Sequence, residues 1–249
     1  MSGHSKWATI KHKKGAADKK RAKLFAKLIK QVEVAARTGG GDLDANATLR
    51  TMYQKARDSS VPLDTIERAV KRGTGELEGV NYEPIAYEGY APAGVALYID
   101  VLTDNRNRSG SEIRSMLSKN GGSLAEPGAV SWQFERKGIV LLPKGDLSED
   151  DLMLIALDGG AEDLTDLGEN WQLMSEPTDL NGLRDALVAA DVEFTSADLV
   201  MVPQQTVELD EKDARSVLNL IEVLEDNDDV QDVFSNFDIS EDVMNALAS

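Results

Sequence analysis

Apolar and polar positions along the chain change their spacing near residue 80. Before that point apolar residues recur every three or four positions in three stretches, a spacing typical of amphipathic helices. The stretches run from about Asp18 to Thr38, from about Asp44 to Asp58, and from Pro62 to Gly73. Three glycines end the first stretch, and the Gly-rich acidic segment that begins at Gly73 is typical of a linker. The pattern predicts a helical domain over residues 1–80.

From Tyr82 onward, short strands alternate with helices. Runs of branched and aromatic residues end at turn residues, as strands do. The helices between them begin near capping side chains: Ser109 and Glu112 have capping-box spacing, and Ser148 and Asp210 precede apolar helical patterns. The predicted strands are Ile85–Tyr90, Val95–Leu102, Val130–Phe134, Gly138–Leu142, Ala161–Asp166, Trp171–Met174, Glu193–Val202, Val207–Leu209 and Val230–Phe234.

The order of these elements predicts the architecture. Residues 138–202 follow the order β-α-β-β-α-β, which is the ferredoxin-like arrangement. Residues 82–136 and 205–249 each lack a complete sheet, but together they supply one α/β sandwich. We therefore expect an α+β multidomain protein with an N-terminal basic helical domain followed by two ferredoxin-like α/β sandwich domains. The domain at 138–202 is expected to be inserted into a discontinuous domain built from 82–136 plus 205–249.

Charge is distributed unevenly between these parts. The 249 residues carry a formal net charge of −17. Residues 1–80 contain 17 Lys and Arg against 9 Asp and Glu, whereas residues 81–249 contain 10 against 35. A net charge of +8 at one end and −25 on the remainder indicates an end that binds polyanions, because the acidic body repels phosphate and orients the encounter.

Composition excludes several classes of function. No run approaches about 18 consecutive apolar residues, so no membrane partner is expected. The basic N-terminus has no apolar stretch behind it and does not resemble a secretory signal, so we expect a cytoplasmic protein. Cys is absent and only His4 and His12 are present, which argues against disulfides, thiol chemistry and a zinc site. Phosphate-binding loops, serine-hydrolase elbows and metalloprotease motifs are also absent, so we expect no enzyme and no cofactor.

The first predicted helix separates apolar from basic residues. Phe25, Leu28, Val32 and their neighbours form an apolar stripe, and lysines occupy the opposite face. A solvated lysine face is one interpretation. The context favours a nucleic-acid-binding surface, because residues 1–30 contain ten Lys and Arg against one acid, and a polyanion relieves their repulsion. The candidate contacts in this region are Lys6, Lys11, His12, Lys13, Lys14, Lys19, Lys20, Arg21, Lys23 and Lys27.

Trp7 lies among these charges. It can stack on a base, or it can fold the N-terminal arm onto the helices, and the second role is favoured for a single aromatic residue. Residues 44–72 offer two helices around a short turn, but the second begins with Asp64 and Glu67 near its start. Acids at the reading end suit a phosphate-lined groove poorly, so base-specific duplex reading is disfavoured.

A second candidate is the loop Thr103–Arg108, at the entrance of a predicted helix. Arg106 and Arg108 can grip phosphate there with help from the helix N-terminus. Equally, Asn105 and Asn107 can cap the helix while the arginines pair with Asp104 and Glu112. The acidic run 225–229 lacks the glycine of a calcium loop and is more typical of a turn.

Several of these segments resemble the YebC/PmpR family over essentially the whole chain. The residues that carry the resemblance are Gly3–Trp7, Lys11–Lys14, Asp18–Arg21, Gly39–Asp42, Tyr87–Tyr90, Thr103–Arg108 and Asp228–Val233. The resemblance implies a bacterial or organellar protein with a helical N-terminal domain and two α/β domains around a concave face. It also implies either a DNA-binding transcriptional regulator, the traditional description, or a factor acting on stalled ribosomes.

Taken together, the sequence predicts a non-enzymatic nucleic-acid-binding regulator of gene expression. We favour a translation factor that contacts ribosomal RNA, because the lysine-rich stripe suits backbone contacts and no convincing base-reading helix is present. A DNA-binding transcriptional regulator is the close alternative. A protein-interaction or ligand-sensing module is a third possibility, which leaves the basic N-terminus unexplained.

Overall fold

Alternating apolar residues build the first sheet. Leu97, Ile99 and Val101 point to one face of a strand because side chains alternate along it, and all three are buried. The computed structural model describes residues 18–145 and 147–248. Its first sheet has the order β3-β1-β2-β9 and is antiparallel throughout, with Glu83 opposite Thr103 in β1 and β2. These strands are β1 (Glu83–Tyr90), β2 (Ala96–Thr103), β3 (Ser123–Leu124) and β9 (Val230–Ser235).

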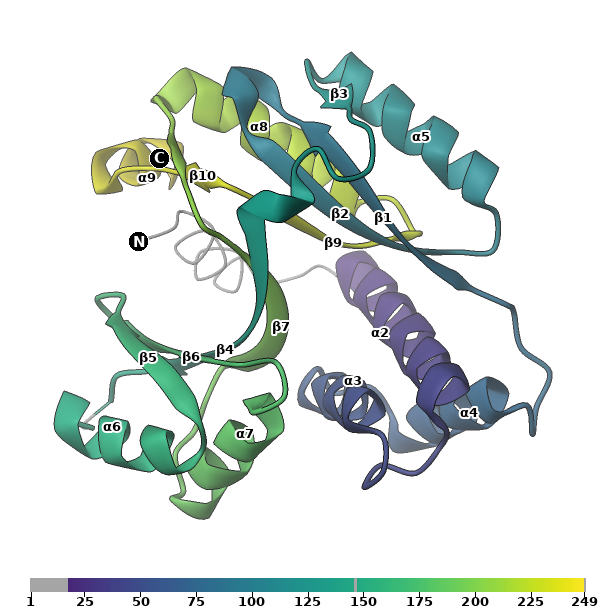
Figure 1. Cartoon of the computed structure of the whole chain (residues 1–249), viewed down its shortest axis with the longest axis vertical. Coiled ribbons are helices and arrows are strands. Elements are labelled where there is room, and N and C mark those ends of the chain that lie inside the picture. Colours follow the sequence, from purple (N-terminus) through teal and green to yellow (C-terminus); the bar gives the residue numbers. More distant parts are fainter. Residues whose placement is uncertain (1–17, 146, 249) are drawn as a thin grey trace. The chain divides into compact units, whose positions relative to one another are not determined.

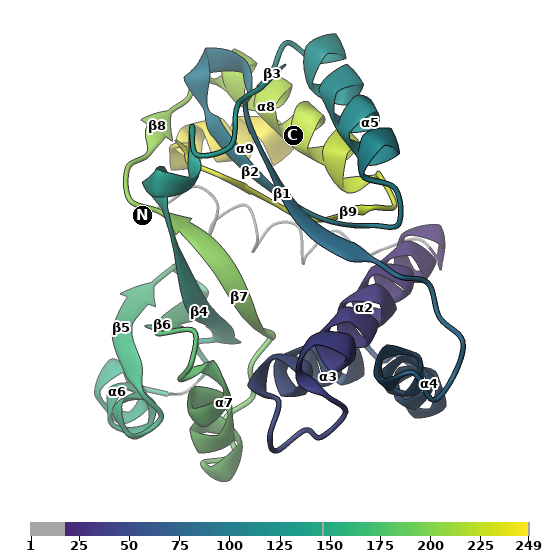
Figure 2. The same cartoon turned by 45° about the vertical axis from the view of Figure 1, so that its right-hand side comes forward.

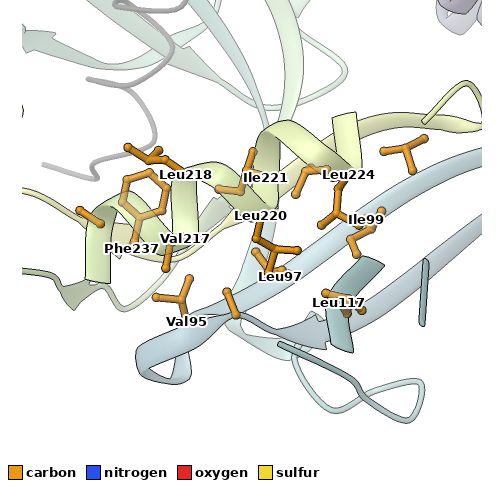
Figure 3. Packing of buried hydrophobic residues seen from close by; sticks show 14 of the residues in the cluster. Val95, Leu97, Ile99, Leu117, Val217, Leu218, Leu220, Ile221, Leu224 and Phe237 are labelled. Atoms are coloured by element: carbon orange, nitrogen blue, oxygen red, sulfur yellow. The ribbon is translucent and has the colours of Figure 1, made fainter. Parts of the chain in front are cut away.

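Two helices, α5 (Arg106–Lys119) and α8 (Glu211–Glu225), cover one face of this sheet (Figure 1). Their apolar stripes meet the buried side chains of β2, and the resulting core includes Leu117, Val217 and Phe237 (Figure 3). The short helix α9 (Glu241–Ala248) adds partly buried residues to the same core. A small parallel pair, β8 (Val207–Glu208) and β10 (Phe237–Asp238), completes this part.

The second sheet has the order β5-β6-β4-β7. With α6 and α7 between its strands in the chain, this is the ferredoxin-like order that the sequence predicts. Both helices lie on one face of the sheet (Figure 2), and the core between them includes Leu142, Leu152, Leu173 and Leu183. The elements are β4 (Phe134–Pro143), α6 (Glu149–Asp158), β5 (Ala161–Asp166), β6 (Asn170–Ser175), α7 (Leu180–Ala189) and β7 (Ser196–Pro203).

Three helices precede the sheets: α2 (Asp18–Gly39), α3 (Ala47–Asp58) and α4 (Leu63–Thr74). The predicted apolar stripe of α2 is confirmed, since Leu28, Val32 and Ala36 are buried. Glu33 is buried beside them and accepts hydrogen bonds from Arg37 and Arg72, which ties α4 to α2. A buried carboxylate requires such partners because desolvation without them is costly.

The chain forms two compact units. Of the described residues, one unit contains 18–27, 80–135 and 201–248, and the other contains 28–79, 136–145 and 147–200. The α+β class with one α/β sandwich inserted into another is therefore present, and the three domain boundaries expected from the sequence stay a prediction. Within the second unit, α3 contacts α7 through Thr51 and Asn181, and Asp58 pairs with Arg184. None of the helices in the described part of the chain is long and apolar enough to cross a membrane.

Two local predictions are wrong. The separate strand expected at 130–134 is a 3₁₀ turn over Ser131–Gln133 that leads directly into β4. The buried carboxylate of Glu88 accepts hydrogen bonds from the backbone N–H groups of Val130 and Ser131, so these groups are not free for a strand ladder. The helix expected to begin at Ser109 begins at Arg106, because Asn105 provides the cap.

Candidate nucleic-acid interface

Six of the nominated contacts lie outside the described residues. They are Lys6, Trp7, Lys11, His12, Lys13 and Lys14, so both interpretations of Trp7 stay predictions. Lys19 and Lys20 fall within the first turn of α2, and their side chains also lie outside what the structure describes. Arg21 is exposed, with its guanidinium carbon 5.3 Å from the ring centre of Phe25.

Lys23 and Lys27 contact the acidic turn that follows α8. The Nζ of Lys23 lies 2.6 Å from Oδ1 of Asp226 and 3.9 Å from Oδ1 of Asp228. It also donates to the backbone carbonyl of Asp226, and Lys27 donates to the carbonyl of Glu225. Both lysines are only partly exposed, and the carboxylates of Asp226 and Asp228 partly neutralise Lys23 on the basic face of α2.

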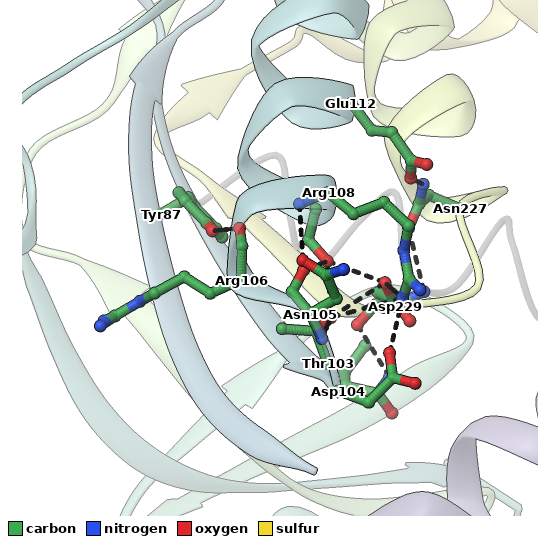
Figure 4. Close-up of polar contacts among 11 residues, drawn as sticks. Tyr87, Thr103, Asp104, Asn105, Arg106, Arg108, Glu112, Asn227 and Asp229 are labelled. Carbon is green, nitrogen blue, oxygen red and sulfur yellow. Dashed lines mark hydrogen bonds and ion pairs between the residues drawn. The ribbon is translucent and has the colours of Figure 1, made fainter.

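The loop before α5 is held by a buried carboxylate (Figure 4). Oδ2 of Asp229 lies 2.6 Å from Nη2 of Arg108, 2.8 Å from Oγ of Ser109 and 3.2 Å from Oγ1 of Thr103. The backbone N–H of Asn105 donates to Thr103 Oγ1, which fixes the turn. Asp229 directly precedes β9, and Thr103 is the last residue of β2. The side chain of Asp229 therefore connects these two strands to the start of α5.

Local capping accounts for part of this loop. The side chain of Asn105 accepts from the backbone N–H of Arg108, and Arg108 also pairs with Asp104 at 2.9 Å. Hydrogen bonds to Asp229 and then to Asp104 raise the pKa of Arg108 above its ordinary value. Glu112, the other predicted partner of the arginines, instead accepts from Asn227.

Arg106 has different surroundings from Arg108. Its side chain extends away from the cluster around Asp229, and it is exposed (Figure 4). Among the described residues its guanidinium has no ion pair. Its backbone carbonyl accepts from Oη of Tyr87 at 3.1 Å, which anchors the position from the β1 side. Burial raises the pKa of Tyr87, opposed by the charge of Arg106, so the phenol stays protonated at neutral pH.

Another carboxylate, Glu88, holds the segment that precedes β4. Its oxygens accept from the backbone N–H groups of Gly128, Val130 and Ser131 at 2.7, 2.6 and 2.9 Å. Burial alone would raise the pKa of Glu88, but these donors outweigh it and hold the pKa below its ordinary value. Sequence reasoning missed Glu88 and Asp229 as organising residues, although both lie in segments that carry the family resemblance.

Several cations of α3 and α4 are paired with acids of the second unit. On α3, Arg50 pairs with Asp185 and Lys55 with Asp198, both within the second unit. On α4 the first turn carries Asp64, which pairs with Arg68 at 3.6 Å. That base-specific duplex reading from this pair of helices is disfavoured stays a prediction.

Helices followed by two α/β sandwiches, one inserted into the other along the chain, define the class of protein. Residues 5–76 match the model described as the TACO1/YebC protein N-terminal domain, and residues 82–237 match the TACO1/YebC second and third domain. The chain belongs to the TACO1/YebC family.

Relatives and a solved structure agree with this assignment. Proteins from Acidothermus cellulolyticus and Streptomyces avermitilis, each named probable transcriptional regulatory protein, are 58% and 57% identical over 245 residues. The alignments cover 98% of this chain and 99% and 98% of those proteins. The crystal structure of a conserved hypothetical protein, Aq1575 from Aquifex aeolicus, is 43% identical, with a TM-score of 0.84. The match covers 94% of this chain and 97% of the Aquifex aeolicus chain.

Proposed function

We propose that this protein is a non-enzymatic regulator of gene expression that binds nucleic acid. The basic segment before α2 and the cationic residues of α2 hold the phosphate backbone, and Arg106 makes a second contact. The observation that carries this proposal is the contrast at the loop before α5. Asp229, Thr103 and Asn105 fix the backbone there, and Arg108 acts as a positioning residue, which leaves Arg106 extended into solvent.

We favour RNA, and the ribosome in particular, as the target in the cytoplasm. Lysine is a compact point charge that suits backbone phosphates rather than bidentate reading of base edges. The cations Arg50 and Lys55 of α3 are paired with acids, and α4 begins with an acidic turn. These features support backbone-directed binding without duplex sequence reading.

A DNA-binding transcriptional regulator is the second candidate. It is favoured by one specific observation, the name carried by relatives that are 57% and 58% identical over nearly the whole chain. The same basic residues would then contact the backbone of duplex DNA.

Co-sedimentation with ribosomes distinguishes the two candidates. The tagged protein is centrifuged with ribosomes through a sucrose gradient at near-physiological salt, beside the triple variant Lys19→Glu, Lys20→Glu, Lys23→Glu. We expect the wild type to travel with ribosomes and the variant to remain at the top. Wild-type protein that stays at the top would contradict the ribosome proposal, and binding to promoter DNA then becomes the test. Equal sedimentation of the variant would show that α2 is not the anchor.

A further inference from the structure

The turn after α8 concentrates negative charge where a helix tolerates it poorly. Glu225 ends α8, Asp226 caps it, and Asp228 and Asp229 follow within three residues. The last turn of α8 contains no basic residue. Because the C-terminus of a helix is the negative end of its dipole, cations stabilise this end and carboxylates do not. The turn therefore needs positive charge from elsewhere in the fold.

Lys23 and Lys27 of α2 supply that charge. The Nζ of Lys23 contacts both a carboxylate and the backbone carbonyl of Asp226, at 2.6 and 2.8 Å. The Nζ of Lys27 reaches the carbonyl of Glu225, the last residue of α8, at 2.6 Å. The two lysines lie four residues apart, one helical turn, so they approach the turn from the same face of α2.

We propose that the acidic turn Glu225–Asp229 competes with nucleic acid for Lys23 and Lys27 of α2. Oxygens of Glu225, Asp226 and Asp228 contact the ammonium groups of Lys23 and Lys27, which phosphate oxygens would otherwise contact. A polyanion that binds α2 must displace these oxygens. The turn therefore lowers the affinity of α2 for nucleic acid, and only a polyanion that binds more tightly than these internal contacts replaces them. This inference rests on the proposed function, because it concerns the same lysines.

The exposure of the pair makes such an exchange feasible. The side chains of Lys23 and Asp226 are 31% and 73% exposed. An ion pair this exposed shifts an equilibrium by about 5-fold at most, and salt screens it. A nucleic acid offers several phosphates at once and releases condensed counterions when it binds. The internal contact therefore weakens binding by a measurable factor without preventing it.

The test neutralises the turn without changing its size. The variant Asp226→Asn, Asp228→Asn is compared with the wild type for binding to a fluorescein-labelled 20-nucleotide RNA by anisotropy. The matched control is Glu126→Gln, Glu208→Gln, which changes the net charge equally at exposed positions of the same unit. We expect the turn variant to bind about 2- to 5-fold more tightly and the control to change less. An equal gain in both would mean that only net charge matters and would overturn the proposal.

A double-mutant cycle shows whether the turn acts through α2. Lys23→Gln is made in the wild type and in the neutralised background. If the turn competes for Lys23, Lys23→Gln should lower the RNA affinity by a larger factor in the neutralised background than in the wild type. In that background the contact between Lys23 and phosphate forms without breaking an internal contact. An equal loss in both backgrounds contradicts competition at Lys23. Melting curves for all variants confirm folding, and if the neutralised turn does not fold, Asp228→Asn alone replaces it.

These measurements separate a failure of the competition from a failure of the proposed function. Wild-type protein that does not bind the RNA, or duplex DNA of the same sequence, contradicts the proposed function. Wild-type binding that is insensitive to the turn contradicts only the competition.

Discussion

Arg106 and Arg108 stand two positions apart at the start of α5 and have different surroundings. Arg108 is bound by Asp229 and Asp104, so its charge is already used within the fold. Arg106 is exposed, and the hydrogen bond from Tyr87 holds its backbone carbonyl, while its guanidinium forms no ion pair with the residues that the structure describes. At the scale of single residues, we therefore expect Arg106 to contact phosphate and Arg108 to hold the loop in position.

Replacing each arginine separates these roles. Arg106→Ala is expected to leave the melting temperature unchanged and to lower RNA affinity, because one phosphate contact disappears. The slope of log affinity against log salt should fall in magnitude by about 1. Arg108→Ala is expected to lower the melting temperature, since the buried carboxylate of Asp229 loses its cationic partner. Thermal melts and anisotropy titrations at several salt concentrations measure both. A destabilised Arg106→Ala would contradict the division of roles.

Glu88 makes a pH-dependent contribution to stability. Its folded-state pKa lies below its ordinary value of 4.5, so its contribution is fully present at neutral pH, where the carboxylate is ionised in both states. The contribution is lost as the pH falls below about 4.5 through the depressed folded-state pKa. Glu88→Gln is expected to cost about 1–3 kcal/mol at pH 7, because backbone donors lose an ionised acceptor.

Urea unfolding at pH 7 and pH 3.5 measures this effect. The difference in free energy of unfolding between wild type and Glu88→Gln should be largest at pH 7 and smaller at pH 3.5, because the carboxyl is protonated in the unfolded chain at the lower pH. Glu126→Gln, at an exposed acid two residues before Gly128, serves as the control and should show little difference at either pH. A Glu88→Gln deficit that is the same at both values would contradict the assignment.

At the scale of elements, α2 and α4 pack closely against each other where α4 carries a glycine. Gly73 is buried near the end of α4. A methyl group at this position would lie 2.6 Å from Cβ of Ala36 and against the carbonyl oxygen of Glu33. The absence of a side chain therefore allows the two helices to approach, and the buried Glu33 with Arg37 and Arg72 fixes their register.

Gly73→Ala tests this approach. Alanine favours helix formation by about 1 kcal/mol over glycine, but crowding in a packed interface costs about 1–3 kcal/mol. We expect a net destabilisation, because the neighbouring backbone of α2 cannot move aside without breaking its own hydrogen bonds. Lys71→Ala, at an exposed position of the same helix, should be close to neutral. Chemical denaturation compares the two, and a stabilised Gly73→Ala would contradict the packing argument.

At the scale of the whole molecule, charge separation governs the encounter with nucleic acid. The basic first 80 residues precede a strongly acidic remainder, so the net charge of −17 is a poor guide to the binding end. If about six phosphates are contacted, the slope of log affinity against log salt should be roughly −4 to −5.5. Anisotropy titrations from low to near-physiological salt measure it. A flat response would point to the protein-interaction alternative.

Periodic patterns in the sequence predicted most elements, because helices and strands bury apolar side chains at fixed intervals. The stripe of Leu28, Val32 and Ala36, and the ferredoxin-like order of β4 to β7, followed in this way. The failures occurred where distant groups compete for the backbone. Glu88 takes the N–H groups that a strand at 130–134 would need, and nothing local to that segment indicates it.

The sequence by itself determined the class of fold, the family, and the asymmetry of charge, because these depend on composition, order and spacing along the chain. Only the tertiary structure decided which cations are available. Asp229 follows Arg108 by 121 residues and Asp226 follows Lys23 by 203, yet each pair is in contact. Such pairing depends on where the sheets bring distant segments together, and spacing in sequence carries no record of it. For that reason the tertiary structure distinguishes Arg106 from Arg108, which the sequence treats alike.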